Sequence, residues 1–300
     1  MDFSKAQDFE WKELGDGTVE ITGYVGNDIQ VNIPAELGGK SVKKIGPSAF
    51  QFCKALESVK IPAGVAEIDD SAFMCCDSLK YINIPDGVVR IGGAAFFGCP
   101  FTEVTIPASV EDIDDKAFAC CHDLEKITVS DDNGNFSSVG AVMFNKDKTR
   151  IVFYSETNRE KEYLIPDSVK EIAKNAFLGA SALEALTVSD SSETFSSVDG
   201  VLFSKDGTRL ILYPEGRPGT EYTIPDSVTG IEYGIFEGLQ FGKLTLTYKG
   251  TQYKQNNGSF GEQLYTAING KPRPSRFGAL YDAIDAHKKL MSEAESLLNK

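Results

Sequence analysis

The sequence predicts a solenoid in which short repeated units stack and expose a β-sheet along one face. A seven-point apolar pattern, Val-x2-Ile-x4-Phe-x2-Cys-x2-Leu-x2-Val-x-Ile, recurs six times within the 300 residues. The pairs that mark its copies begin at Ala49, Ala72, Ala95, Ala117, Ala176 and Ile235. A unit of 22 or 23 residues cannot enclose a core alone, so neighbouring units must share one apolar interior.

Each unit ends in a half-buried strand, because Leu-x2-Val-x-Ile alternates inward and outward side chains. Val59 and Ile61 point inward, and Pro62 ends the ladder because it lacks an N–H. Stacking turns the outward positions of successive strands into two columns. The candidate binding face consists of the outward residues Ser58, Lys60, Tyr81, Asn83, Glu103, Thr105, Lys126 and Thr128.

Two units are enlarged by insertions near residues 130–164 and 189–223, which lengthen the step between repeats to 59 residues. The insertions align with each other without a gap, and each predicts a β-hairpin. In the second, apolar residues before Ser204 and after Thr208 flank an Asp-Gly turn. Tyr154 and Tyr213, at the ends of the two hairpins, are a second candidate for binding, although we expect them in the core of the insertions.

The repeat resembles the BspA-like leucine-rich repeat family of bacterial proteins, whose units carry a similar AFxxC-x2-L-x2-V-x-IP core. The similarity runs from Val19 to Leu246. It implies an α/β fold, a right-handed leucine-rich-repeat solenoid with a β-sheet face, an N-terminal β cap, two inserted β-hairpins and a C-terminal helix. The pattern departs at Ala180, Leu239 and Ile235, and one residue is missing before Phe101 and Phe241. We expect those units to pack less regularly.

Three segments organise the chain. Residues 1–32 predict a β-meander that caps the first rung, where Trp11 is expected to pack; residues 33–246 form the solenoid; and residues 247–300 form a C-terminal cap. That last segment predicts a hairpin, a short helix over FGEQLYTAIN and a long amphipathic helix after Ser275. The long helix either docks on the solenoid or makes a homo-oligomer through residues 276–300.

Composition excludes several classes of partner. The net charge of −14 repels nucleic acids, and no apolar run is long enough to insert into a membrane. The first eight residues lack the apolar core of a signal peptide, so the chain as given is expected to be cytoplasmic. The resemblance instead implies a secreted or cell-surface protein if a leader precedes these residues.

The cysteines and histidines do not form a pattern typical of catalysis or metal binding. Cys53, Cys76, Cys99 and Cys121 share one repeat position, and we expect a ladder of buried thiols without disulfides. His122 follows Cys121, but adjacent side chains point in different directions, so a surface histidine is expected. The loop from Ser130 to Asn135 lacks the Gly and Glu of a calcium-binding EF-hand. We predict no enzyme, no cofactor and no metal.

The sequence therefore favours a non-catalytic binding module that uses its exposed strand face. The resemblance implies interaction with a protein partner, or adhesion by bacterial surface or secreted proteins. Tyr81 is the aromatic residue of the face, and tyrosines are frequent energetic centres of interfaces. The alternative is a structural protein that assembles through its C-terminal helix.

Overall fold

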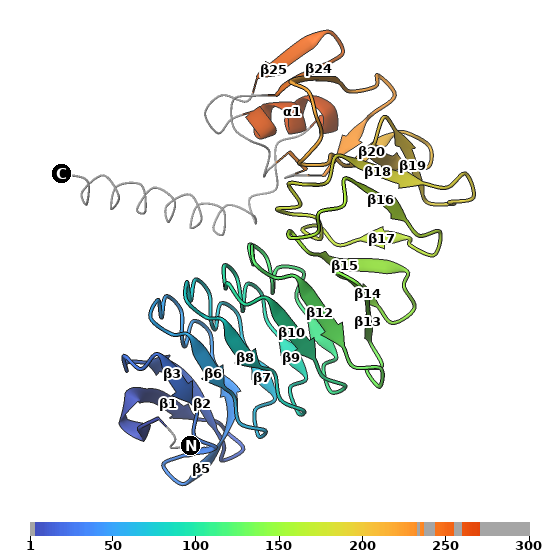
Figure 1. Cartoon of the computed structure of the whole chain (residues 1–300). Helices are drawn as coiled ribbons and strands as arrows, with labels where there is room; N and C mark the ends of the chain where they lie inside the picture. Colours follow the sequence, from blue (N-terminus) through green and yellow to red (C-terminus); the bar gives the residue numbers. More distant parts are fainter. Residues whose placement is uncertain (1–3, 233–234, 237–243, 255–259, 271–300) are drawn as a thin grey trace, which may run out of the picture.

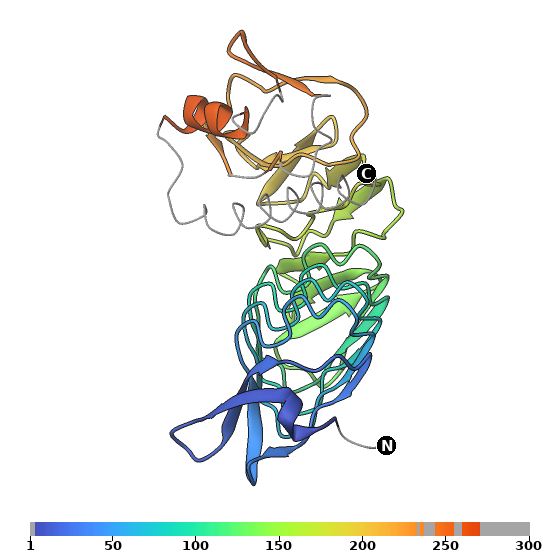
Figure 2. The same ribbon diagram turned by 90° about the vertical axis from the view of Figure 1, so that its left-hand side faces the viewer.

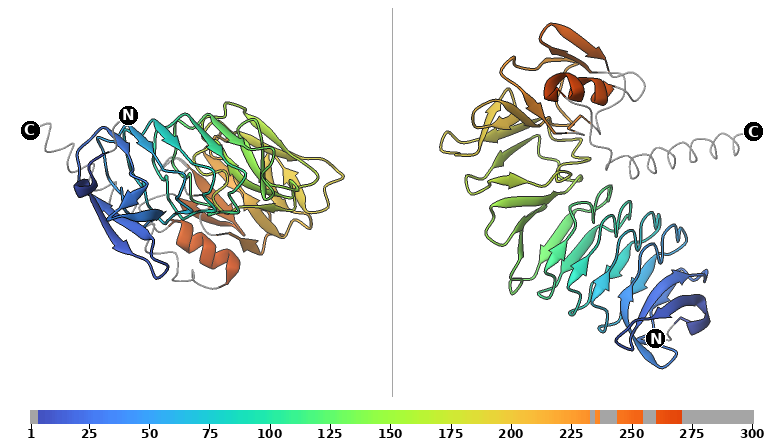
Figure 3. Two further views of the ribbon diagram at one scale, coloured as in Figure 1. Left: turned by 90° about the horizontal axis from the view of Figure 1, so that it is seen from below. Right: turned by 180° about the vertical axis from the view of Figure 1, so that it is seen from behind.

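The computed structural model describes residues 4–232, 235–236, 244–254 and 260–270. The chain forms a curved stack of rungs that runs from the N-terminal strands to helix α1 (Phe260–Asn269), as Figures 1 and 3 show. After a quarter turn, the N-terminal rungs appear as flattened loops lying one on another (Figure 2). The predicted solenoid fold is confirmed.

The strands are short throughout. Those of the first half are β1 (Phe9–Glu13), β2 (Val19–Tyr24), β3 (Gln30–Asn32), β4 (Glu36–Leu37), β5 (Lys40–Ile45), β6 (Ser58–Lys60), β7 (Glu67–Ile68), β8 (Tyr81–Asn83), β9 (Arg90–Ile91), β10 (Glu103–Ile106), β11 (Asp112–Ile113) and β12 (Lys126–Val129). Those of the second half are β13 (Phe136–Val139), β14 (Val142–Asn145), β15 (Arg150–Tyr154), β16 (Glu162–Ile165), β17 (Glu171–Ile172), β18 (Ala185–Val188), β19 (Phe195–Val198), β20 (Val201–Ser204), β21 (Arg209–Leu212), β22 (Glu221–Thr223), β23 (Gly230–Ile231), β24 (Thr245–Tyr248) and β25 (Thr251–Lys254). A 3-10 turn, η1 (Ala6–Asp8), precedes β1.

These strands form two columns along the stack. In the first column β2, β5, β7, β9 and β11 pair in parallel, and the antiparallel β1 covers the outer edge. The strand that closes each unit belongs to the second column, which is divided into the sheets β3-β6-β8, β10-β12, β16-β18 and β22-β24-β25. Each regular rung therefore presents one strand to each of two faces.

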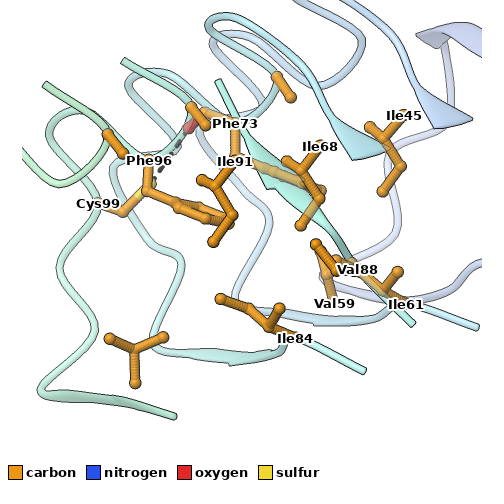
Figure 4. Close-up of a cluster of buried hydrophobic side chains, with 14 of the residues drawn as sticks. Ile45, Val59, Ile61, Ile68, Phe73, Ile84, Val88, Ile91, Phe96 and Cys99 are labelled. Carbon is orange, nitrogen blue, oxygen red and sulfur yellow. Dashed lines mark hydrogen bonds between the residues drawn. The ribbon is translucent and has the colours of Figure 1, made fainter. Parts of the chain in front are cut away.

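A row of phenylalanines forms the axis of the core. The rings of Phe50, Phe73, Phe96 and Phe118 stack with centroids 4.9, 5.6 and 5.5 Å apart and interplanar angles of 16° or less. Isoleucines of the first column, such as Ile68 and Ile91, pack beside the row (Figure 4). Identical positions stack because the units repeat with nearly constant length, so one aromatic position produces a continuous apolar interior.

The cysteine position ties each rung to the preceding one. The thiols of Cys76, Cys99 and Cys121 donate hydrogen bonds of 3.1 Å to the carbonyl oxygens of Phe50, Phe73 and Phe96; Figure 4 shows the bond of Cys99. No disulfide is present in the described part of the chain. The predicted thiol ladder is confirmed for these three residues. Cys53 is only half-buried.

Each insertion supplies a substitute rung. Strands β13, β14 and β15 pair as an antiparallel sheet, and β19, β20 and β21 repeat this arrangement. Tyr154 N–H donates to Ala176 O at 2.7 Å, just as Phe73 N–H donates to Ala95 O at 2.8 Å in a regular unit. Tyr154 is fully buried and stacks on Phe177 with centroids 4.7 Å apart. The hairpin prediction is confirmed, and the tyrosine takes the place of the repeat phenylalanine.

The ends of the chain agree only partly with the predictions. Trp11 does not pack over the first rung; it lies on the turn at Gly38 with 37% of its surface exposed. Phe9 fills the expected place, because it contacts Tyr24 and Phe50 from the buried side of β1. The predicted hairpin and short helix appear as β24-β25 and α1. The long helix, residues 276–300 and the departures at Leu239 and Phe241 lie outside the described residues.

Candidate binding face

The candidate face lies on β6, β8, β10 and β12, where the outward side chains form the two columns that the sequence predicts. In the ladders, Ser58 pairs with Tyr81 and Lys60 with Asn83. On the following pair of strands, Glu103 is opposite Lys126 and Thr105 opposite Thr128. All of these residues are exposed except Ser58, which is half-buried. Whether they bind a partner stays a prediction.

A shallow, open groove of about 850 Å³ crosses the first part of this face. Its lining comes from β3, β6, β8 and the start of β10, and comprises Gln30, Asn32, Ser58, Val59, Lys60, Lys80, Tyr81, Ile82, Asn83, Thr102 and Glu103. Tyr81 is 71% exposed, the most exposed large apolar side chain of the described residues. The groove thus combines one aromatic ring with amide, hydroxyl and charged groups.

The groove includes a break in the strand column. No ladder joins β8 to β10, and the break coincides with the residue that is missing before Phe101. Ile82 is only half-buried, whereas its counterparts Val59 and Val104 are 4% and 3% exposed. The shortened unit therefore packs less regularly, as predicted, and it leaves part of an inward-facing side chain accessible from the groove.

Asn83 has a structural task at this site. Its Oδ1 accepts the N–H of Ile61 at 2.9 Å, and its Nδ2 donates to the carbonyl oxygen of the same residue at 3.2 Å. The amide thereby satisfies the backbone of the neighbouring rung just before Pro62, where the ladder ends. A partner can contact Asn83, but it can bind the whole side-chain amide only if these two hydrogen bonds break.

Ion pairs link successive rungs of the column formed by β5, β7, β9 and β11, which sequence reasoning missed. Lys44 lies 3.1 Å from Glu67 and 2.8 Å from Asp69, and Arg90 lies 2.9 Å from Asp69. Farther along the column, Arg150 contacts Asp115 and Glu171. The signal was present: the residue before the repeat Ile alternates in sign from unit to unit, as Glu20, Lys44, Glu67, Arg90 and Asp112.

A cluster of acids and one histidine at the turns of the insertions was also missed. His122 Nδ1 contacts Glu156 Oε2, and this hydrogen bond raises the pKa of His122 above its ordinary value. Glu215 accepts the N–H of Gly179 at 2.8 Å. Burial raises the pKa of Glu215 to about 7, and the nearby Glu156 adds to this rise. His122 is exposed, as expected, but it belongs to a charge cluster that spans several rungs.

The remaining candidates for chemistry have structural roles. Burial raises the pKa of Cys53 and of Cys75 to about 11, which disfavours the reactive thiolate. In the loop from Ser130 to Asn135, the side-chain amide of the buried Asn133 donates hydrogen bonds to the carbonyl oxygens of Pro107 and Val110. Residues 4–232 and the other described ranges contain no group of three potential metal ligands. Among them, no helix has the length and apolarity needed to span a membrane.

The fold and its surface define a leucine-rich repeat solenoid. The family profile of the BspA type leucine rich repeat region matches residues 43–160 and 149–205, in six copies. The chain therefore belongs to the BspA-type leucine-rich repeat family. None of the proteins with curated functions is significantly similar to it.

Several solved structures of bacterial leucine-rich repeat proteins are similar to this chain. A leucine-rich repeat protein from Eubacterium ventriosum is 21% identical, with 80% of this chain and 70% of that chain covered and a TM-score of 0.51. A leucine-rich repeat protein from Bacteroides ovatus is 26% identical, with coverages of 83% and 67% and a TM-score of 0.47. A leucine rich cell surface protein from Faecalibacterium prausnitzii is 20% identical, with coverages of 91% and 99% and a TM-score of 0.38.

Proposed function

We propose that the protein is a non-catalytic interaction module that binds a protein partner through its strand face. The observation that carries this proposal is the groove around Tyr81, which lies on the face that each unit extends by one row of side chains. Solenoids of this kind bind through such extended surfaces, because exposed positions can vary without disturbing the stacked core. A surface location, as an adhesin or an envelope scaffold, fits the bacterial family to which the chain belongs.

The energetic centre of the proposed interface is Tyr81. An exposed tyrosine offers a large rigid surface together with a hydroxyl group, and such residues often supply much of the binding energy. Lys126 extends the same face two rungs along the stack, opposite Glu103. A partner that covers four rungs would contact both residues, so changing them together tests the whole face.

Partners are first captured from envelope and host extracellular proteins on the immobilised chain. Their direct binding is then measured. Each purified candidate is titrated against the wild type and against the double variant Tyr81→Ala, Lys126→Ala. We expect the double variant to bind at least about tenfold more weakly, the loss typical of an interface centre. The matched control is Lys170→Ala, which removes an exposed lysine away from this face. Equal affinities of the double variant and the wild type would exclude the strand face.

A further inference from the structure

Individual basic residues of the two strand columns differ in whether they form ion pairs. On the β5-β7-β9-β11 column, Lys44 and Arg90 each contact at least two carboxylates. On the candidate face, Lys60 and Lys80 line the groove, yet neither takes part in any ion pair found among the described residues. A chain with a net charge of −14 thus has two lysines without an ion pair in the groove that also holds Tyr81, the most exposed aromatic side chain of the described residues.

We infer that the groove binds an extended acidic segment of the partner protein, with its carboxylates at Lys60 and Lys80 and an apolar side chain on Tyr81. This inference rests on the proposed function and specifies the chemistry of its partner. Carboxylates complement ammonium groups by charge and hydrogen bonding. The ring of Tyr81 and the partly accessible Ile82 provide the apolar contact that a purely electrostatic site would lack.

The dimensions of the groove set the length of the segment. The lining spans β3, β6, β8 and the start of β10, and neighbouring strands in a sheet lie about 4.8 Å apart. Two such spacings separate β3 from β8, and the step to β10, which no ladder joins, is at least as long. The groove therefore spans about 14 Å or more, which an extended chain covers with roughly four or more residues at about 3.3 Å per residue. The ligand is therefore a short linear segment.

The position of Glu103 gives the segment a polarity. This carboxylate lines the β10 end of the groove, whereas the two lysines lie on and just before the strands β6 and β8. Acidic residues are favoured over β6 and β8, and a neutral or basic residue is favoured over β10, because like charges repel. The overall negative charge of the protein acts over a longer range, but salt screens it beyond about 8 Å at physiological ionic strength.

Fluorescence anisotropy with labelled octapeptides tests the inference. The probes are an acidic peptide that alternates Glu with Phe, its Gln-for-Glu counterpart and its Lys-for-Glu counterpart, each titrated with the full chain. We expect the acidic peptide to bind at least about tenfold more tightly than the other two. Binding should weaken at least tenfold in the variant Lys60→Gln, Lys80→Gln, and remain unchanged in the control Lys170→Gln. Circular dichroism verifies that each variant is folded.

Several outcomes would overturn the inference. One is equal binding of the neutral peptide; another is binding that strengthens as salt is raised, which would mean that the overall negative charge dominates. Binding of a carboxylated polysaccharide such as polygalacturonate, with no binding of the acidic peptide, would assign the lysines to another class of ligand. If a protein partner loses affinity in the Tyr81, Lys126 variant while no acidic peptide binds, this inference fails and the proposed function stands.

Discussion

Glu215 should make the protein more stable at mildly acidic pH than at alkaline pH. Burial raises the pKa of its carboxyl group from 4.5 to about 7 in the folded chain. Between these two values the native state holds a proton that the unfolded state releases, so stability falls as the pH rises through this window. The free-energy cost of ionising this buried carboxyl group is absent below pH 4.5 and fully present above pH 7.

The size of the effect follows from the same two pKa values. At about 1.36 kcal/mol per pH unit, the full penalty is roughly 3 kcal/mol, and most of it develops between pH 5 and pH 8. His122 acts in the same direction: its pKa is raised by the contact with Glu156, so its contribution is present at low pH and is lost as the pH rises. The carboxyl group of Asp69, whose pKa is lowered, changes the stability only at more acidic pH.

Urea denaturation followed by circular dichroism at pH 5, 6, 7 and 8 measures this dependence. We expect the free energy of unfolding to fall by roughly 2 to 3 kcal/mol from pH 5 to pH 8 in the wild type. Glu215→Gln should remove most of this fall and be the more stable protein at pH 8, because Gln can still accept the N–H of Gly179. Glu221→Gln, at an exposed position, serves as the control. If Glu215→Gln keeps the pH dependence of the wild type, the reasoning is wrong.

Two further predictions concern the turns and the thiols. Gly200 and Gly207 both have positive φ, but only at Gly200 would an added Cβ meet another atom closely, 2.7 Å from Ala185 Cβ. Gly200→Ala should therefore unfold at lower urea than Gly207→Ala, by roughly 1 to 3 kcal/mol in the free energy of unfolding; equal losses would mean that backbone strain alone decides. Cys76, Cys99 and Cys121 should not react with a thiol reagent at pH 8 until urea unfolds the chain, because they are buried; rapid labelling of any of these three residues in the native protein, located by peptide mass spectrometry, would contradict this.

The repeating parts of the fold could be predicted because one interaction recurs in every unit. Phe73 and Phe96 stack because they hold the same position in units of equal length, and the regular spacing of the repeats predicts this stacking. The hairpins and the short helix were likewise readable, because their periodicities are local. The position of Trp11 was predicted wrongly because burial of an aromatic residue is only a tendency, and Phe9, at the buried start of β1, fills the interior.

The features that were missed depend on contacts between units of unequal length. His122 and Glu156 are separated by 34 positions, and they meet only because the insertion rebuilds a rung in register with the regular ones. The groove depends on a break between β8 and β10. Irregular packing of the shortened unit was expected, but the missing residue alone does not indicate that a groove opens there. For the candidate face, the exposed positions and their two columns could be predicted from the repeat, but the absence of ion pairs at Lys60 and Lys80 within the part of the chain that the structure describes could not.

The alternation of charge along the β5-β7-β9-β11 column has a consequence for how the repeats assemble. Neighbouring rungs place Lys44 beside Glu67 and Glu67 beside Arg90. A chain that skipped one rung while folding would bring Lys44 against Arg90, and like charges at that spacing repel each other. Near-identical units could otherwise exchange places with little loss of stability. The alternating charges therefore favour the native order, because only units of opposite sign stack without repulsion. By the same logic, an evolving array of this kind should gain or lose rungs in twos.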